Sequence, residues 1–346
     1  MSKTLQDYAT LINDTIQSNE INHYITTDNM CQNLGGIDTF KNINIPQGKV
    51  RSFQKDDVLL SNIRLYFRKV YRAKQKGGCS SDVLVFRAKH IDSATLFAIL
   101  SSQIFTDYAC SGSQGSKMPR GNKTHMMDFK IPTINFTIAK IFNSIQNKIE
   151  NNHKINELLH KIAYKIYEYY FKYKPKNAKL EQIIIENPKS SIMVKNAQKT
   201  QDKYPFFTSG DNILSYPKAI IDGRNCFLNT GGNAGIKFYV GKASYSTHTW
   251  CIYANEFSDY LYLLLSSIKT HINQSFFQGT SLKHLQKNLL KKYPIYMPSA
   301  HEIKKFNQII MPLLTLISIN TRTSKKLEQI RDFLLPLLLK QQVKPK

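Results

Sequence analysis

The sequence predicts an α+β protein: two tandem β-rich domains separated by two long helices that pair as an antiparallel coiled coil. Three observations predict this class, namely an internal repeat, short apolar runs bounded by turns, and two long stretches with heptad spacing. Residues 77–88 align with residues 243–254, which lie 166 positions later (243 − 77). Residues 114–116 recur as residues 278–280. Because no short motif fills the interval, the repeat indicates two domain-sized modules and not a solenoid.

The first globular domain is assigned to residues 1–131, where short strands and turns are expected. Residues 57–60 and 82–86 are apolar, β-branched runs bounded by charged or glycine-containing turns, so they predict strands. Residues 93–102 predict a helix with Ser93 as its N-cap. Residues 111–122 are rich in Gly and Ser and predict an exposed loop.

The first long helix, a spacer, is assigned to residues 132–175. Lys148 and Asn152 occupy two seam positions in its middle, where a polar pair is expected to fix the register at a cost in stability. Pro175 is predicted to end the helix. Nearly five heptads of apolar residues predict a coiled coil. They are Ile138, Ile141, Ile145, Ile155, Leu159, Ile162, Ile166 and Tyr169.

The second globular domain, residues 176–298, and the second long helix, residues 299–341, repeat this plan. Strands are predicted at residues 206–207, 219–221, 226–228 and 250–253, and a helix at residues 258–270. In the second long helix, Pro312 and Pro336 predict a kink or an interruption, and the apolar pattern lapses at residues 320–324. The apolar positions are Ile303, Phe306, Ile310, Leu313, Ile317, Leu327, Ile330, Leu334 and Leu337.

Two interpretations of the long helices remain open at this point. The helices can bury their apolar stripes against each other and form a rod that holds the two domains at a set distance, like a ruler. Alternatively, each helix is the last element of its own domain's core. The 3.5-residue period and the length favour the rod.

The charge of the chain indicates a polyanionic partner. The sequence has 48 Lys and Arg against 24 Asp and Glu, a net charge of +24. An excess of this size destabilises a compact chain through self-repulsion, so a polyanion that neutralises it is expected. Nucleic acid is the favoured partner. AT-rich codon usage raises the number of lysines but does not explain the shortage of acids.

Five cysteines without a C-x-x-C pair predict neither a disulfide framework nor a zinc site, as expected in a reducing cytoplasm. No secretion signal or membrane-spanning run is recognised, so we expect a soluble, cytoplasmic protein without a membrane partner.

The motifs of common enzyme classes are not found. The chain has no G-x-x-x-x-G-K-[ST] loop, no G-x-G-x-x-G fingerprint after a strand and no H-x-x-x-H pair. We therefore expect a non-catalytic protein that binds no cofactor or metal itself.

Candidate DNA-binding residues fall in the turns of both domains. Arginines next to aromatic side chains suit phosphate clamping and guanine reading, and glycine pairs let backbone amides approach phosphates. A solvated surface position is the ordinary alternative for any one lysine, and the Gly231–Gly232 pair also suits a plain hairpin turn. The candidates of the first domain are Arg51, Arg64, Tyr66, Arg68, Lys117, Arg120 and Lys123. Those of the second domain are Thr208, Ser209, Thr230, Asn233, Lys237, Lys283 and Lys287.

Taken together, these features resemble the specificity (S) subunit of Type I restriction-modification systems. The resemblance is carried by residues 55–69, 77–86, 207–210 and 229–235, and above all by residues 330–339. It implies two target recognition domains, each reading one half of a split double-stranded DNA target. It also implies helices that carry two methyltransferase (M) subunits, with restriction (R) subunits joining for cleavage. S-adenosylmethionine would then be bound by the M subunit, and ATP and Mg by the R subunit.

Other assignments compete with this one. The chain could be the S subunit of a related system in which one polypeptide combines modification and cleavage, or a stand-alone DNA-binding scaffold. A divergent methyltransferase or nuclease ranks third. Co-purification of a stoichiometric methyltransferase would separate an S subunit from a stand-alone scaffold. Binding of S-adenosylmethionine by the isolated chain would support the enzyme assignment.

Overall fold

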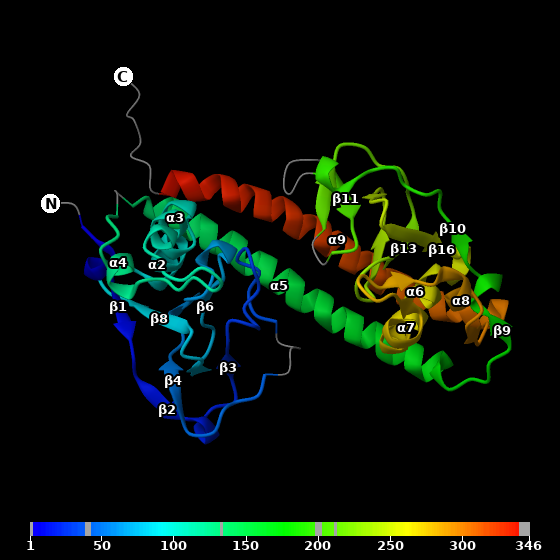
Figure 1. Cartoon of the computed structure of the whole chain (residues 1–346), viewed down its shortest axis with the longest axis horizontal. Coiled ribbons are helices and arrows are strands. Elements are labelled where there is room, and N and C mark those ends of the chain that lie inside the picture. Colours follow the sequence, from blue (N-terminus) through cyan, green and yellow to red (C-terminus); the bar gives the residue numbers. More distant parts are fainter. Residues whose placement is uncertain (1–2, 39–42, 132–133, 198–202, 211–212, 339–346) are drawn as a thin grey trace. The chain divides into compact units, whose positions relative to one another are not determined.

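The computed structural model describes residues 3–38, 43–131, 134–197, 203–210 and 213–338 (Figure 1). The last positions assigned to the second long helix, residues 339–341, lie outside these ranges. The chain divides into two compact units: residues 1–151 with 326–346, and residues 152–325. The helices α5 (Phe136–Tyr167) and α9 (Ala300–Leu338) each contribute to both units. The four-segment domain division predicted from the sequence stays a prediction.

Unit 1 contains two four-stranded sheets and a set of short helices. One sheet has the order β1 (Ala9–Ile12), β8 (Val83–Ala88), β5 (Val58–Ser61), β6 (Val70–Arg72), all antiparallel. The other has the order β2 (Thr15–Gln17), β4 (Lys49–Phe53), β7 (Gly77–Cys79), β3 (Tyr24–Ile25), with β3 parallel to β7. The helices are α1 (Leu5–Tyr8), α2 (Ser93–Leu100), α3 (Gln103–Ser111) and α4 (Lys123–Met127), with 3-10 turns η1 (Ser18–Glu20) and η2 (Leu65–Phe67).

The central strands of unit 1 are apolar on both faces because both faces are covered. Val58 and Leu60 of β5 face a core shared with α2, while Leu59 between them faces a core shared with the second sheet. This explains why the sequence shows a continuous apolar run there instead of alternation. Glycine is needed where β7 crosses close to a neighbouring segment, since a Cβ at Gly77 would lie 2.5 Å from the His23 carbonyl oxygen.

Unit 2 repeats the main-sheet topology of unit 1 and the parallel strand pair of its second sheet. Its main sheet has the order β10 (Ile185–Glu186), β16 (Thr249–Tyr253), β13 (Arg224–Asn229), β14 (Ile236–Val240), again antiparallel. A second sheet orders β12 (Leu214–Tyr216), β11 (Tyr204–Phe207), β15 (Ser244–Tyr245), with β11 parallel to β15 as β3 is to β7. The predicted duplication of an α+β module is therefore confirmed.

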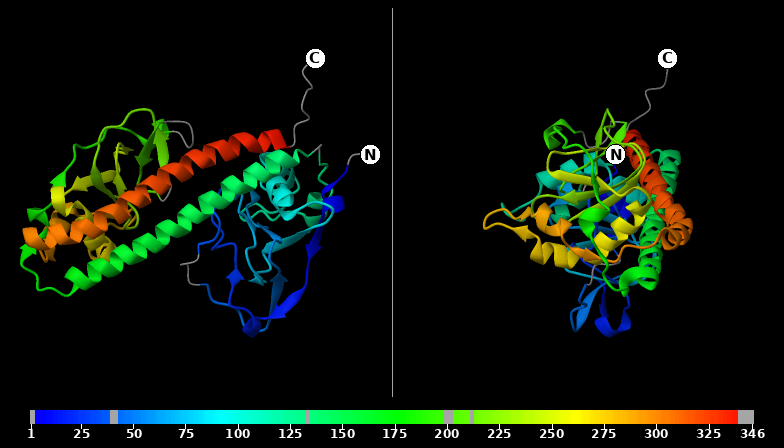
Figure 2. Two further views of the ribbon diagram at one scale, coloured as in Figure 1. Left: turned by 180° about the vertical axis from the view of Figure 1, so that it is seen from behind. Right: turned by 90° about the vertical axis from the view of Figure 1, so that its right-hand side faces the viewer.

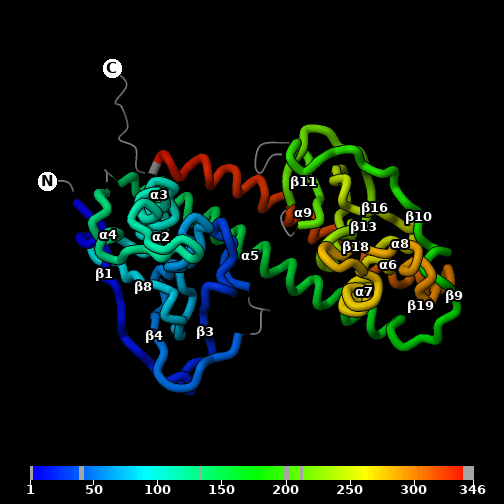
Figure 3. Tube along the Cα trace, in the orientation of Figure 1, coloured from blue at the N-terminus to red at the C-terminus, as the bar shows by residue number. Residues whose placement is uncertain are grey.

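Figure 3 follows the path of the backbone through the rest of unit 2. The helices are α6 (Ser258–Ser267), α7 (Lys269–Ser275) and α8 (Lys287–Lys291). The strand pairs are β17 (Phe277–Gln278) with β18 (His284–Leu285), and β19 (Pro294–Ile295) with β9 (Ala178–Lys179). The 3-10 turns are η4 (Leu180–Gln182), η5 (Val194–Asn196) and η6 (Asn255–Phe257), and the π-helical turn η3 (Glu168–Lys172) continues α5 beyond Tyr167.

Several local predictions are wrong. Asp92, not Ser93, caps α2, because its carboxylate accepts from the Thr95 amide at 2.9 Å. Residues 219–221 form an edge loop and not a strand; Ile221 makes only an isolated bridge to Ala243. The helix predicted at residues 258–270 breaks at Ile268, which separates α6 from α7.

Within each unit, a stretch of α5 pairs with a stretch of α9 in the antiparallel sense (Figure 2). In unit 1, Arg331 Nη1 donates to Gln146 Oε1 at 3.0 Å. In unit 2, Asn152 Nδ2 donates to Ser324 Oγ at 3.1 Å, and Asn156 Nδ2 donates to Thr321 Oγ1 at 3.3 Å. Partner numbers on α9 fall as those on α5 rise, so the antiparallel pairing is confirmed. Their action as a ruler stays a prediction.

Most buried residues of α5 come one position later in the sequence than the predicted seam residues. Ile141, Ile155, Ile162 and Tyr169 are exposed by 46%, 41%, 49% and 85%. Lys148 is exposed as well, so its placement in the seam is wrong, whereas Asn152 is buried there. The buried face contains alanines and amides that an apolar pattern does not detect. It consists of Ala139, Phe142, Gln146, Ile149, Asn152, Ala163 and Tyr167.

In α9 the helix runs unbroken through both prolines, so an interruption there is wrong, while a kink stays a prediction. Pro312 and Pro336 lie on the exposed face, where water can satisfy the carbonyl that each leaves unbonded. The lapse at residues 320–324 is a polar part of the same seam. Ser324 is its buried residue, and the buried positions beyond it are Arg331 and Leu335, not Ile330 or Leu334.

Candidate nucleic-acid interface

Four segments of unit 1 meet at one end of the main sheet. We call residues 25–29, 62–68, 80–82 and 114–121 the first loop cluster. Backbone hydrogen bonds join them: the Ser80 amide donates to the Ile25 carbonyl at 2.9 Å, and the Asn62 amide to the Asp82 carbonyl at 2.8 Å. The fourth segment is joined by the Gly121 amide, which donates to the Asn62 carbonyl at 3.1 Å. The cluster is therefore a built frame and not a set of independent loops.

Six of the seven predicted residues of the first domain belong to this frame or brace it. Arg51 Nη1 donates to the carbonyls of Ser81 and Val83 and so supports the 80–82 turn. Arg64 Nη2 donates to the Lys117 carbonyl at 3.4 Å. The other members are Tyr66, which is 54% exposed, Arg68, Lys117 and Arg120.

Arg120 is the arginine of the first loop cluster that presents its guanidinium outward. Its side chain is 62% exposed, and Nη2 donates to Asp82 Oδ1 at 2.9 Å. This single contact orients the guanidinium and leaves its other N–H groups without a protein acceptor among the described residues. Arg120 is thus held in a defined direction and remains able to bind a ligand.

Arg68 and Lys123 are placed differently. Arg68 Nη2 donates to the Ser101 carbonyl at 2.9 Å, and burial lowers the pKa of its guanidinium. This geometry favours a structural role at the end of α2, and its DNA contact stays a prediction. Lys123 begins α4 and is exposed beside the cluster.

Unit 2 gathers the equivalent segments. We call residues 207–210, 229–233, 246–248 and 278–284 the second loop cluster. The Ser246 amide donates to the Phe207 carbonyl at 2.9 Å, and the Thr230 amide to the His248 carbonyl at 3.2 Å. Thr230 Oγ1 donates to the same carbonyl at 2.8 Å, as does Ser209 Oγ. The predicted Thr208, Ser209, Thr230, Asn233 and Lys283 all lie in this cluster.

The two remaining candidates of the second domain serve packing. Lys237 Nζ donates to the Thr208 carbonyl at 2.9 Å and to Asn229 Oδ1 at 3.3 Å, so it braces the loop from below. Lys287 lies over the Trp250 ring, 5.1 Å from its centroid, and burial lowers the pKa of its ammonium. DNA contacts by either residue stay predictions.

Two residues of these clusters were missed by sequence reasoning: Asp82 and His248. The signal was available in the internal repeat, because residues 80–82 and 246–248 are the same turn in the two copies. Without that alignment, a lone Asp and a lone His do not indicate a binding site.

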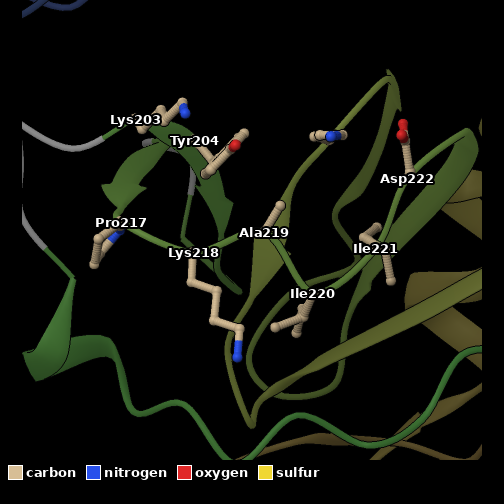
Figure 4. A pocket seen from close by; sticks show the side chains of 9 residues that line it. Lys203, Tyr204, Pro217, Lys218, Ala219, Ile220, Ile221 and Asp222 are labelled. Atoms are coloured by element: carbon tan, nitrogen blue, oxygen red, sulfur yellow. The ribbon is translucent and has the colours of Figure 1, made fainter.

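Two hollows in unit 2 add surface features. One, of about 530 Å³, is bordered by Lys203, Lys218 and Lys242 with Asp222 (Figure 4). The labelled amines of Lys203 and Lys218 point in different directions, so they do not converge on one anion. The other, of about 650 Å³, is an apolar groove on the long helices, lined by residues that include Ile162, Tyr169 and Ile309.

The chemistry of the described residues offers no reactive centre that we recognise. Within those ranges, His, Cys, Asp and Glu side chains form no group of three that could hold a metal ion. Burial raises the pKa of the Cys79 and Cys251 thiols to about 12, which makes them poor nucleophiles. Among the helices of the described part of the chain, none is long and apolar enough to cross a bilayer.

Comparisons with known proteins agree with this picture. Residues 176–329 match the family model of the Type I restriction modification DNA specificity domain. The structure of a Type-I restriction-modification system S subunit from M. genitalium is similar, with a TM-score of 0.64 and 14% identity over 99% of this chain and 96% of that chain. The HsdS subunit from Thermoanaerobacter tengcongensis aligns with a TM-score of 0.37 and 13% identity, over 98% of this chain and 96% of that one. No curated protein sequence matches significantly.

Proposed function

We propose that this chain is a specificity subunit of a Type I restriction-modification system and reads the DNA sequence for it; the match of residues 176–329 to the specificity-domain model supports this. Its target would be bipartite double-stranded DNA, with one half-site read by each unit. The observation that carries this proposal is the duplicated sheet framework, which presents a loop cluster in each unit. The net charge of +24 supplies the attraction to phosphates.

The chain's part in catalysis would be indirect. Methyltransferase subunits, two per chain, would dock on the long helices, and restriction subunits would join for cleavage. S-adenosylmethionine would be bound by the former, and ATP and Mg by the latter. Exposed apolar side chains on α5 and α9 support docking, because a soluble surface exposes such groups together mainly where a partner covers them. In unit 2 they include Ile155, Leu158, Ile162, Tyr169, Ile309, Leu316 and Ile319.

The proposal is tested by sequencing the methylated bases of cells with and without this gene. We expect a motif of two short blocks separated by a fixed unspecified gap, present only with the gene. The two blocks should differ, because the two copies share few side chains. One continuous motif would contradict the bipartite target.

Docking is tested in the same cells with Ile162→Asp and Tyr169→Asp in one chain. We expect the methyltransferase to stop co-purifying and the motif to disappear. Met193→Asp, at a position that is 52% exposed and outside the long helices, is the matched control. Capture of a single polypeptide that combines modification and cleavage would assign the fused type of system. Retention of the methyltransferase by the double variant would remove this face from the interface.

A further inference from the structure

The two loop clusters are equivalent position by position. In unit 1 strand pairing sets Ser61 opposite Val83, and in unit 2 it sets Asn229 opposite Thr249. The residues that follow Ser61 and Asn229 then donate backbone hydrogen bonds to equivalent turns, at Asp82 and His248. Asp82 and His248 therefore occupy the same position of the repeated frame.

The loops that cover these turns are equivalent too. The Arg64 amide donates to the Pro119 carbonyl at 2.9 Å, and the Gly232 amide donates to the Lys283 carbonyl at 2.9 Å. Arg64 and Gly232 both adopt left-handed backbone angles, with φ of 50° and 80°. In Arg64 this conformation is uncommon for a residue with a Cβ, so the frame imposes it.

Isolated bridges fix the remaining equivalence. Ile63 bridges Arg120 in unit 1, and Gly231 bridges His284 in unit 2. Arg120 and His284 thus stand at one position of the frame. Two residues before them, Met118 and Leu282 are 53% and 57% exposed, so both loop tips are apolar and alike. One chemical difference between the clusters is the pair Asp82 and Arg120, which is replaced by His248 and His284.

We propose that Arg120, oriented by Asp82, reads a guanine in the half-site of unit 1, and that unit 2 has no such guanine contact at the equivalent position. This inference rests on the proposed function. Guanine presents O6 and N7 as two acceptors on one edge, and two N–H groups of an arginine match them in a bidentate pair. Arg120 uses one nitrogen for Asp82 and keeps the outward groups for the base. Asp82 is then a positioning residue.

The other arginines in and beside the first loop cluster do not fit this role; Arg68, for example, donates to the Ser101 carbonyl. Arg64 Nη2 donates to the Lys117 carbonyl, and its Nε is buried. Arg51 donates to two carbonyls of the 80–82 turn. Both hold the frame on which Arg120 is mounted.

The test uses the full chain with its co-purified partners and a pool of randomised DNA duplexes, selected and sequenced. The variants are Arg120→Ala, Arg120→Lys and Asp82→Asn. Lys89→Ala is the control: it removes an exposed cation beyond the opposite end of β8 from Asp82. Thermal unfolding of each variant verifies folding.

We expect a guanine in one half of the wild-type motif. Arg120→Ala should reduce the preference for it roughly 10- to 100-fold and leave the other half unchanged. Arg120→Lys should also lose the preference while keeping general affinity, because lysine lacks the planar fork. Asp82→Asn should weaken the same position less. Lys89→Ala should keep the motif.

Other outcomes overturn the inference in distinguishable ways. If the wild-type complex selects no motif, the proposed function itself fails. If it selects a motif that Arg120→Ala leaves intact or weakens equally in both halves, only the guanine contact fails. As a second arm, His284→Arg with His248→Asp installs the pair in unit 2 and should add a guanine to the other half-site; an unchanged second half counts against the inference.

Discussion

The role of a charged or titratable residue in this protein depends on its surroundings and not on its residue type. Arg224 forms a two-point contact with the carboxylate of Asp259, which is only 1% exposed. Burial raises the pKa of Asp259, against the opposing effect of Arg224. Arg120, by contrast, is paired once and open to solvent. An arginine side chain is thus structural at position 224 and open to a ligand at position 120.

His160 illustrates a residue whose burial links folding to pH. Tyr262 Oη lies 3.3 Å from its Nδ1, and burial lowers the pKa of the imidazole below its ordinary value of 6.5. Because the unfolded chain binds the proton more readily, the contribution of His160 is fully present above about pH 6.5. It is lost as the pH falls from there towards the lowered pKa.

We therefore expect the urea midpoint to fall between about pH 7.5 and about pH 5.5, and to fall less in His160→Gln. Tyr262→Phe is the matched control, because desolvation and not the hydrogen bond lowers the pKa, so the pH dependence should persist. Urea unfolding followed by circular dichroism at both pH values measures the effect. Equal pH dependence in wild type and His160→Gln would refute it.

At the level of elements, the paired helices are defined by polar contacts as much as by apolar ones. Asn152 and Ser324 are 1% and 2% exposed and bond to each other within unit 2. Gln146 and Arg331 do the same within unit 1. Buried polar pairs of this kind disfavour other registers, because a slip would leave each partner unsatisfied.

Removing one partner of the Asn152–Ser324 hydrogen bond should reduce the free energy of unfolding more than removing both. We expect Asn152→Ala to destabilise the protein by about 1–3 kcal/mol, because Ser324 Oγ is left buried and unpaired. The double variant Asn152→Leu with Ser324→Ala should recover part of that loss. Ile155→Ala, on the exposed side of α5, should change stability by roughly 0.5 kcal/mol or less. Denaturant unfolding gives all three values; a double variant that loses as much stability as Asn152→Ala, or more, would show that the pair is not coupled.

For the whole molecule, the remaining question is whether the helices set the spacing of the two half-sites. The unit boundaries fall after residue 151 on α5 and after residue 325 on α9. Inserting a matched heptad at both places preserves the seam within each unit. Each insertion adds roughly 10 Å of helix, about three base pairs of duplex.

We expect the methylated motif of this variant to have a longer gap, or binding to be lost because the units are rotated about the DNA. The control inserts the same residues after Pro175, between η3 and β9, where added length should be tolerated. Sequencing of methylated bases reports the gap directly. An unchanged gap in the double-heptad variant would show that the helices belong to the cores of the units and do not act as a ruler.

Much of the architecture could be predicted because it depends on local pattern. The strands of residues 57–60 and 82–86, the two long helices and the duplication follow from β-branched runs, heptads and repeated segments. The cap at Asp92 and the break at Ile268 were mispredicted, since neighbouring residues compete for such roles within a turn. The candidate site was predicted in outline, as loops, but not as a frame.

The sequence by itself determined the duplicated module, the helix lengths and the charge of +24, since these depend on residue order and composition alone. Only the tertiary structure decided which face of α5 is buried, because alanine and asparagine fill a close helix contact that isoleucine at position 155 does not. It also decided that Arg68 is used internally while Arg120 faces solvent, and that Arg120 stands where His284 stands in the second copy. Those properties arise from partners distant in sequence, and no local pattern encodes which partner a side chain will meet.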